Sequence, residues 1–190
     1  RNHQVMVSSR GEEAVRVALA TLAGIGSGKV AGCAADVTKP ADAKKLWDRA
    51  VAAFGGVDIW INNAGMTNRK APFANLPDEQ IAMVIATNLN GVMNCCKVAI
   101  AGMLAQGRGT VFNMEGFGSD GLTDAGMSVY GTTKCAVRYF TKALIKDYKD
   151  TPLVIGLMSP GIVVTDLLVR DLYKPGSPEF EKRRRFLNIL

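Results

Sequence analysis

Nine residues near the end of the first third of the chain read Val57-Asp58-Ile59-Trp60-Ile61-Asn62-Asn63-Ala64-Gly65. The first five predict a strand, and the Asn-Asn-Ala-Gly sequence that follows predicts an abrupt exit from it. Continuously apolar strands are typical of parallel sheets that helices cover on both faces. Ligands of such sheets bind beyond the carboxyl ends of the strands, so we expect functional residues just after each strand.

The same alternation of strand and helix continues on both sides of this segment. Apolar runs predict further strands at residues 5–7, 29–37, 110–114 and 153–158. Helical periodicity predicts helices at residues 12–23, 40–54, 78–106 and 128–149, and a helical tail at 178–190. This order predicts an α/β fold with a doubly wound, Rossmann-like parallel sheet in three α/β/α layers.

Length and composition fit one folded domain over residues 1–190. Hydrophobic residues make up 48% and charged residues 21% of the chain, which excludes a disordered or fibrous protein. No uncharged run reaches the roughly 18 residues of a membrane span, so none is predicted. The formal net charge of +6 favours anionic partners, which leaves cofactor phosphates, lipids and nucleic acid open.

The cysteines and the single histidine argue against a metal site. Cys33, Cys95, Cys96 and Cys135 show no C-x-x-C spacing, and His3 is the only histidine. Adjacent Cys95 and Cys96 lie in an apolar helical pattern. We therefore expect them to be small buried hydrophobes, with a redox role as the alternative.

Tyr130 and Lys134 are four residues apart on a predicted helix, so both side chains leave the same face. A cation beside a phenol favours the phenolate and lowers its pKa. Such a tyrosine exchanges protons near neutral pH. The pair alone is a weak signal, because surface helices carry this spacing by chance.

Three motifs together are far more specific. Asn62-Asn63-Ala64-Gly65, Tyr130-x-x-x-Lys134 and Ser159-Pro160-Gly161, in this order and at these spacings, resemble the short-chain dehydrogenase/reductase family over nearly the whole chain. Within that family, the loop Asn113-Met114-Glu115-Gly116-Phe117-Gly118-Ser119 resembles the chlorophyll b reductase, or non-yellow-colouring, branch.

The resemblance implies roles for individual residues. Tyr130 would be the general acid, Lys134 would lower its pKa and bind the nicotinamide ribose, and Asn88 would hold a water that links Lys134 to a proton relay. The alternative for Asn88 is a tolerated polar residue within a helix. Contacts with the cofactor would fall at Ser9, Arg10, Asp36, Val37, Asn62, Ala64, Gly65, Tyr130, Lys134, Pro160, Gly161, Val163 and Thr165.

The cofactor is predicted to be NADPH. Enzymes that prefer NAD place an acid where Ser8-Ser9-Arg10 stands, whereas a ribose 2′-phosphate favours arginine. Arg10 can therefore pair with the phosphate. The alternative is an ordinary helix start with a solvated arginine.

The chain also departs from the family pattern. No hydroxyl stands where the family has its catalytic serine; Ser119, eleven residues before Tyr130, is the nearest substitute, and Ser128 is a competitor that resembles a helix N-cap. The glycine-rich phosphate loop and its strand are missing. We therefore expect an incomplete domain that lacks its first βα unit, whose strand would lie between those of residues 5–7 and 57–61, and its C-terminal strand.

The resemblance implies NADPH-dependent reduction of the C7 formyl group of chlorophyll b or chlorophyllide b to 7-hydroxymethyl chlorophyll a, in chlorophyll breakdown. The protein would act on the stromal side of the thylakoid in the chloroplast, with no transit peptide in this chain. Alternatives are a short-chain reductase of another aldehyde, ketone or steroid, and a non-catalytic NADP-binding or scaffold protein.

Partners are expected at two surfaces. The four consecutive cations at residues 182–185 suit an anionic thylakoid surface or a light-harvesting complex, unless they form one turn of solvated helix. Nucleic acid is not expected, because no aromatic interleaving or base-reading motif accompanies the charge. A homo-oligomer is expected through the helices of residues 78–106 and 128–149, although Met83, Ile85 and Met93 suit a core equally well.

Overall fold

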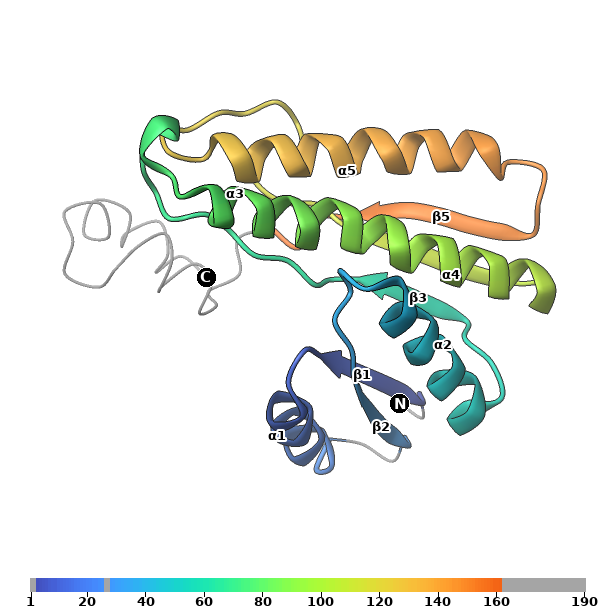
Figure 1. Ribbon diagram of the computed structural model, residues 1–190. Coiled ribbons are helices and arrows are strands. Elements are labelled where there is room, and N and C mark those ends of the chain that lie inside the picture. Colours follow the sequence, from blue (N-terminus) through green and yellow to red (C-terminus); the bar gives the residue numbers. More distant parts are fainter. Residues whose placement is uncertain (1–2, 26–27, 162–190) are drawn as a thin grey trace.

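The computed structural model describes residues 3–25 and 28–161 (Figure 1). Strands and helices alternate in the predicted order: β1 (Val5–Ser9), α1 (Glu12–Leu22), β2 (Val30–Ala34), α2 (Pro40–Phe54), β3 (Ile59–Asn62), α3 (Asp78–Ile85), α4 (Gly91–Gln106), β4 (Gly109–Met114), α5 (Ser128–Asp147) and β5 (Leu153–Met158). A short 3₁₀ helix at Phe73–Asn75 precedes α3. The predicted tail helix lies outside the described residues.

All the strand pairs are parallel, and they form two groups, β1–β2 and β3–β4–β5. The parallel α/β prediction is therefore confirmed. Within the described residues no hydrogen-bonded ladder joins β1 to β3, and a missing strand is predicted between these two strands. The predicted lack of a last strand concerns residues 162–190, outside the described part of the chain.

Helices cover the two strand groups unequally. On one face of β2, Gly32 lies against α1, because a Cβ at this position would collide with Val15. On the other face, Cys33 packs in the core cluster to which α2 contributes. Two helices thus enclose β1 and β2, as a three-layer fold requires. Over β3–β5, α4 and α5 cover one face; on the other face Ile59, Ile61 and Val154 are 58%, 49% and 57% exposed. Among the described residues that second sheet has one helical layer.

The core lies between the sheets and the layer of α2, α4 and α5. The rings of Trp47 and Trp60 lie 6.0 Å apart, and Met103, Val111 and Val137 are fully buried beside them. Gly102 is required at its position, because a Cβ there would collide with the Trp47 indole. This packing seats α2 against α4 and so fixes α4 beneath the strand ends.

The helix predicted at residues 78–106 is continuous but not uniform. The π-helical turn Ala86–Asn90 lies between α3 and α4. π-Turns inside helices are frequent at functional sites. By length and composition alone, the whole segment Asp78–Gln106 is also long and apolar enough to cross a membrane, whereas the sequence predicted no membrane span. Here it packs against α2 and β4, so its apolar face serves the core.

Candidate active site

Tyr130 and Lys134 lie in the first two turns of α5, above the carboxyl end of β4. The buried ammonium of Lys134 donates to the carbonyl of Met114, Nζ to O 3.1 Å, at the last residue of that strand. Its Nζ is 5.7 Å from the centre of the Tyr130 ring. The predicted spacing therefore brings both side chains to one face, next to a strand end.

Burial dominates the protonation of this pair. It raises the pKa of the Tyr130 phenol above its ordinary value and lowers the pKa of the Lys134 ammonium. The sequence predicted that the neighbouring cation lowers the pKa of this tyrosine, whereas burial of the phenol sets the direction of the shift here. A raised pKa keeps Tyr130 protonated at neutral pH, and this is the form that donates a proton.

Asn88, in the π-turn, is fully buried, and both the oxygen and the nitrogen of its side-chain amide form hydrogen bonds. Its Oδ1 accepts from the Met66 N–H at 2.8 Å, and its Nδ2 donates to the Met66 carbonyl at 2.8 Å and to Thr133 Oγ1 at 3.1 Å. A Cβ placed on Gly65 would lie 3.5 Å from Asn88 Oδ1 and 3.9 Å from Lys134 Nζ. Asn88 Oδ1 and Lys134 Nζ therefore face one small space beside Gly65. This arrangement suits the predicted water relay.

Gly116 lies against the phenol and is not among the site residues predicted from the sequence. A Cβ at this position would collide with Tyr130 Oη and lie 3.0 Å from Lys134 Cε. Gly116 falls in the short segment after β4 where the family pattern expects a serine. The missing hydroxyl in the sequence was the signal, because only a glycine leaves room for the ring as it lies here.

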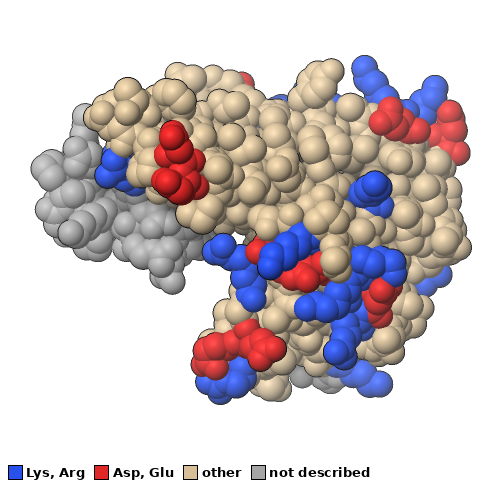
Figure 2. Space-filling model, in the orientation of Figure 1, with Lys and Arg blue, Asp and Glu red and all other residues tan. Residues whose placement is uncertain are grey.

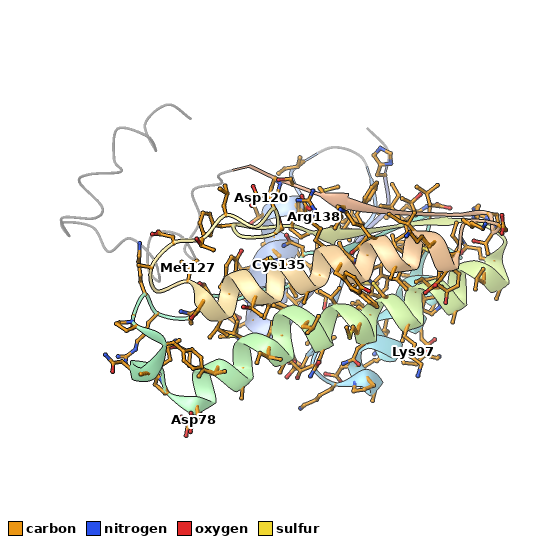
Figure 3. All side chains as sticks on the ribbon, turned by 90° about the horizontal axis from the view of Figure 1, so that it is seen from above. Asp78, Lys97, Asp120, Met127, Cys135 and Arg138 are labelled. Atoms are coloured by element: carbon orange, nitrogen blue, oxygen red, sulfur yellow. The ribbon has the colours of Figure 1, made fainter. Side chains whose placement is uncertain are left out.

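The two candidate serines lie away from the phenol, Ser119 in the loop between β4 and α5 and Ser128 at the start of α5. The Ser119 N–H donates to the Gly116 carbonyl at 3.0 Å, and the Ser119 carbonyl accepts from Arg138 Nη1 at 3.3 Å, two turns after Tyr130. Figure 3 shows Arg138 and Cys135 directed to this side of α5, towards the loop that carries Asp120. Ser128 is the first helical residue, and Met127 precedes it as the N-cap without a side-chain hydrogen bond. No described contact joins Ser119 or Ser128 to the phenol, and the catalytic role of Ser119 stays a prediction.

The residues predicted at the adenine end lie together at the ends of β1 and β2. Ala35 N–H donates to the Ser9 carbonyl at 2.9 Å, which brings the two strand ends side by side. Thr38 hydrogen bonds lower the pKa of Asp36, and the nearby charge of exposed Arg10 contributes in the same direction. Val37 packs against Gly91, where a Cβ would lie 3.3 Å from Val37 Cβ. The arrangement fits an anionic ligand near Arg10.

The role of Asn62 at the cofactor stays a prediction. Its side chain is buried in the core, where Oδ1 accepts from Trp60 Nε1 at 2.8 Å and Nδ2 donates to Asn113 Oδ1 at 2.7 Å. A cofactor can therefore meet only its main chain. Ala64, Gly65, Pro160 and Gly161 are exposed after β3 and β5. Val163 and Thr165 lie outside the described residues.

Cys95 and Cys96 are buried, as the sequence predicts, whereas Cys135 is exposed. Burial raises the pKa of Cys95 to about 12 and that of Cys96 to about 11, so both thiols stay protonated and unreactive near neutral pH. No group of three potential metal ligands occurs in residues 3–25 and 28–161.

The chain is similar to known proteins over most of its length. Residues 1–173 match the family model described as short chain dehydrogenase. A probable chloroplastic chlorophyll(ide) b reductase of Oryza sativa subsp. japonica is 43% identical over 142 residues, which are 74% of this chain and 28% of that protein. A chloroplastic chlorophyll(ide) b reductase of Arabidopsis thaliana is 38% identical over 193 residues, 98% of this chain and 53% of that protein.

A solved structure supports the fold independently. A gluconate 5-dehydrogenase from Burkholderia cenocepacia J2315, in complex with NADP and tartrate, superposes with a TM-score of 0.78 at 27% identity, covering 92% of this chain and 66% of that one. The chain thus spans between about a quarter and two thirds of these proteins. From the family match, the parallel α/β fold and the Tyr130–Lys134 pair, the chain belongs to the short-chain dehydrogenase/reductase family.

Proposed function

We propose that the chain carries the catalytic site of a reductase that converts the C7 formyl group of chlorophyll b, or chlorophyllide b, to hydroxymethyl. The observation that carries the chemistry is the half-buried Tyr130 phenol, which has a raised pKa and lies against Gly116 beside Lys134. The substrate follows from the similarity to chlorophyll(ide) b reductases.

The residues present suit the two ends of a nicotinamide dinucleotide. Arg10 and Asp36 stand at the adenine end, and Tyr130 with Lys134 at the nicotinamide end, while the described residues hold no glycine-rich loop for the pyrophosphate. Arg10 favours NADPH over NADH, because a guanidinium binds a 2′-phosphate by charge-assisted hydrogen bonds. The bound cofactor supplies the hydride that reaches the carbonyl carbon.

The chain's own residues supply the proton and hold the geometry. Tyr130 donates its phenolic proton to the oxygen that becomes an alkoxide, so the aldehyde gains one hydride and one proton and becomes an alcohol. Lys134 stabilises the phenolate left behind. Asn88 holds the water through which Tyr130 regains a proton, because its Oδ1 and the lysine Nζ face the same space.

The loop above the phenol suits a large apolar substrate. Phe117, next to Gly116, is 42% exposed, and Leu122 in the same loop is 62% exposed. Exposed apolar side chains beside a polar reacting group are typical of a binding site for a bulky apolar molecule. A chlorophyll macrocycle has this character, whereas a small sugar does not.

The surface suits an anionic partner in the chloroplast. Lys and Arg side chains gather over α2 in Figure 2, and they include exposed Lys44, Lys45 and Arg49. We infer a contact on the stromal side of the thylakoid with anionic lipid or a light-harvesting complex. Exposed Met83, Ile85 and Met93 on α3 and α4 suit a homo-oligomer.

The test is an assay of the whole natural gene product with chlorophyll b, chlorophyllide b and a panel of small aldehydes and ketones, each with NADPH and with NADH. The proposal expects loss of the formyl-pigment absorbance with NADPH, and little turnover of the small carbonyls. Turnover of small carbonyls alone would favour a reductase of another substrate. NADPH binding without any turnover would favour a scaffold protein.

A further inference from the structure

Asn68 is an uncharged residue in the loop after β3 that no role so far explains, although its side chain is 0% exposed. Every polar atom of its amide is bonded. Nδ2 donates to the carbonyls of Arg69 and Gly126, at 2.9 Å and 2.8 Å, and Oδ1 accepts from the N–H of Tyr130 at 3.1 Å. A buried amide with three partners belongs to a fixed arrangement, because leaving any of them unpaired is costly.

The bond to Tyr130 acts as a helix cap supplied from a distant part of the chain. The first N–H groups of a helix have no partner within it. The N-cap residue of α5, Met127, makes no side-chain hydrogen bond, so Asn68 supplies the acceptor from 62 residues away. The capped N–H is that of Tyr130 itself.

The carbonyl of Tyr130 is held from the other side. Thr133 Oγ1 donates to it at 2.7 Å, and the same hydroxyl accepts from Asn88 Nδ2 at 3.1 Å. Asn88 in turn holds Met66, two residues before Asn68. The N–H and the carbonyl of Tyr130 are thus both bonded to buried side chains, directly to Asn68 of the loop and to Thr133, which Asn88 links to the same loop.

The loop carrying Asn68 is also fastened to the turn that begins α5. Gly126 has a φ of +77°, and a Cβ there would come within 2.9 Å of the Ala71 nitrogen. Lys70 Nζ pairs with Asp124 at 2.9 Å. The turn and the loop therefore move together, and with them the first turn of the helix.

We propose that Asn68 is a positioning residue for Tyr130, which fixes the phenol against Gly116 by holding the N–H of the same residue. The proposal rests on the proposed role of Tyr130 as proton donor. A displacement of about 1 Å at a reacting group costs on the order of a hundredfold in rate. The phenol lies at the far end of its side chain, so a small rotation of the first turn of α5 moves Oη by that much.

Two variants of the whole natural gene product test it. Asn68→Leu removes all three hydrogen bonds while keeping the same branched skeleton of heavy atoms, and Asn68→Asp keeps the acceptor for Tyr130 while losing both donors. The same two changes at exposed Asn75, in the same connecting segment, are the matched controls. Steady-state kinetics per folded molecule, the melting temperature and the ¹³Cζ signal of labelled Tyr130 are measured for each.

We expect Asn68→Leu to lower kcat by about a hundredfold while the KM for NADPH changes less than about threefold. Asn68→Asp should recover most of kcat. Its carboxylate should also move the alkaline limb of the pH profile upward, because a nearby negative charge disfavours the phenolate. The other charged groups around the site, Lys134 and the pairs Lys70–Asp124 and Arg138–Glu115, are the same in all variants.

A fall in melting temperature with kcat unchanged in both variants would overturn the proposal, because Asn68 would then be a structural cap only. If Asn68→Leu does not fold, an unchanged pH profile in Asn68→Asp overturns it. If the wild type reduces no carbonyl, the proposed function fails. The ¹³Cζ signal of Tyr130 then tests the role of Asn68 separately. The inference then expects a raised Tyr130 pKa in Asn68→Asp, and an unchanged ¹³Cζ titration contradicts it.

Discussion

Around Tyr130, buried side chains from three elements bind one another, whereas Arg10 lies exposed beside the half-buried Ser9, Asp36 and Val37 at the ends of β1 and β2. The catalytic end of the proposed site is thus held by contacts within the chain. The cofactor end presents an exposed cation towards solvent. The chain holds the Tyr130 phenol, which must be placed accurately for proton transfer. It leaves the Arg10 guanidinium accessible to a charged ligand.

A buried network of hydrogen-bonded side chains lies under the catalytic end and explains why that end is held in place. It runs from Trp60 through Asn62 and Asn113 to Thr141, with donor–acceptor distances between 2.7 and 2.8 Å. These residues join β3, β4 and α5. Fully satisfied buried networks rigidify a core, and this one supports the helix that carries Tyr130 and Lys134.

The largest effect is expected at the catalytic end. Tyr130→Phe should lower kcat by about 10²- to 10⁴-fold, because it removes the proton donor, while the dissociation constant for NADPH stays the same. In the wild type the raised pKa keeps the phenol protonated, so activity should fall only as pH rises beyond the ordinary tyrosine value of about 10. Steady-state kinetics across pH and cofactor titration measure both. Retained kcat in Tyr130→Phe would exclude the phenol as the acid.

The buried network should be the next most sensitive. Asn113→Ala removes two buried hydrogen bonds, the one from Asn62 Nδ2 and the one to Thr141 Oγ1, so the free energy of unfolding should fall by about 3 kcal/mol. Urea unfolding measures it. The control is Asn90→Ala at an exposed position, expected to change stability by less than about 0.5 kcal/mol. Equal effects at the two positions would mean that the network stabilises nothing.

The third largest effect is expected for substitution of Gly116, the glycine that lies against the Tyr130 phenol. Gly116→Ala should lower kcat by about a hundredfold, because the added methyl group displaces Tyr130 Oη. Gly131→Ala, next to Tyr130 on α5 but with open space around its Cβ, is the control and should retain activity. Similar kcat in the two variants would show that the phenol does not need the space at Gly116.

The smallest effect is expected at the open end. Arg10→Ala should reduce the preference for NADPH over NADH by about tenfold, which is the value of one charge-assisted hydrogen bond. Arg16→Ala, another exposed arginine, paired with Glu13, should leave the preference unchanged. The ratio of kcat/KM for the two cofactors measures this. An unchanged ratio in Arg10→Ala would remove Arg10 from the cofactor site.

The comparison also separates what sequence can predict from what it cannot. Periodicity located the strands and helices through residue 158, and the spacing of Tyr130 and Lys134 placed them on one face. The raised tyrosine pKa, the inward side chain of Asn62 and the space at Gly116 depend on burial and on contacts between distant segments. Asn68 is the clearest case, because no local pattern indicates a helix cap supplied across 62 residues.

The fate of the hydride tests the central claim most directly. Whole natural gene product is incubated with chlorophyll b and NADPH that carries deuterium at the transferred position, and the pigment is analysed by mass spectrometry. The account predicts a hydroxymethyl product with one deuterium, formed by the wild type and nearly abolished in Tyr130→Phe. Unlabelled product, or the same yield from Tyr130→Phe, would contradict it.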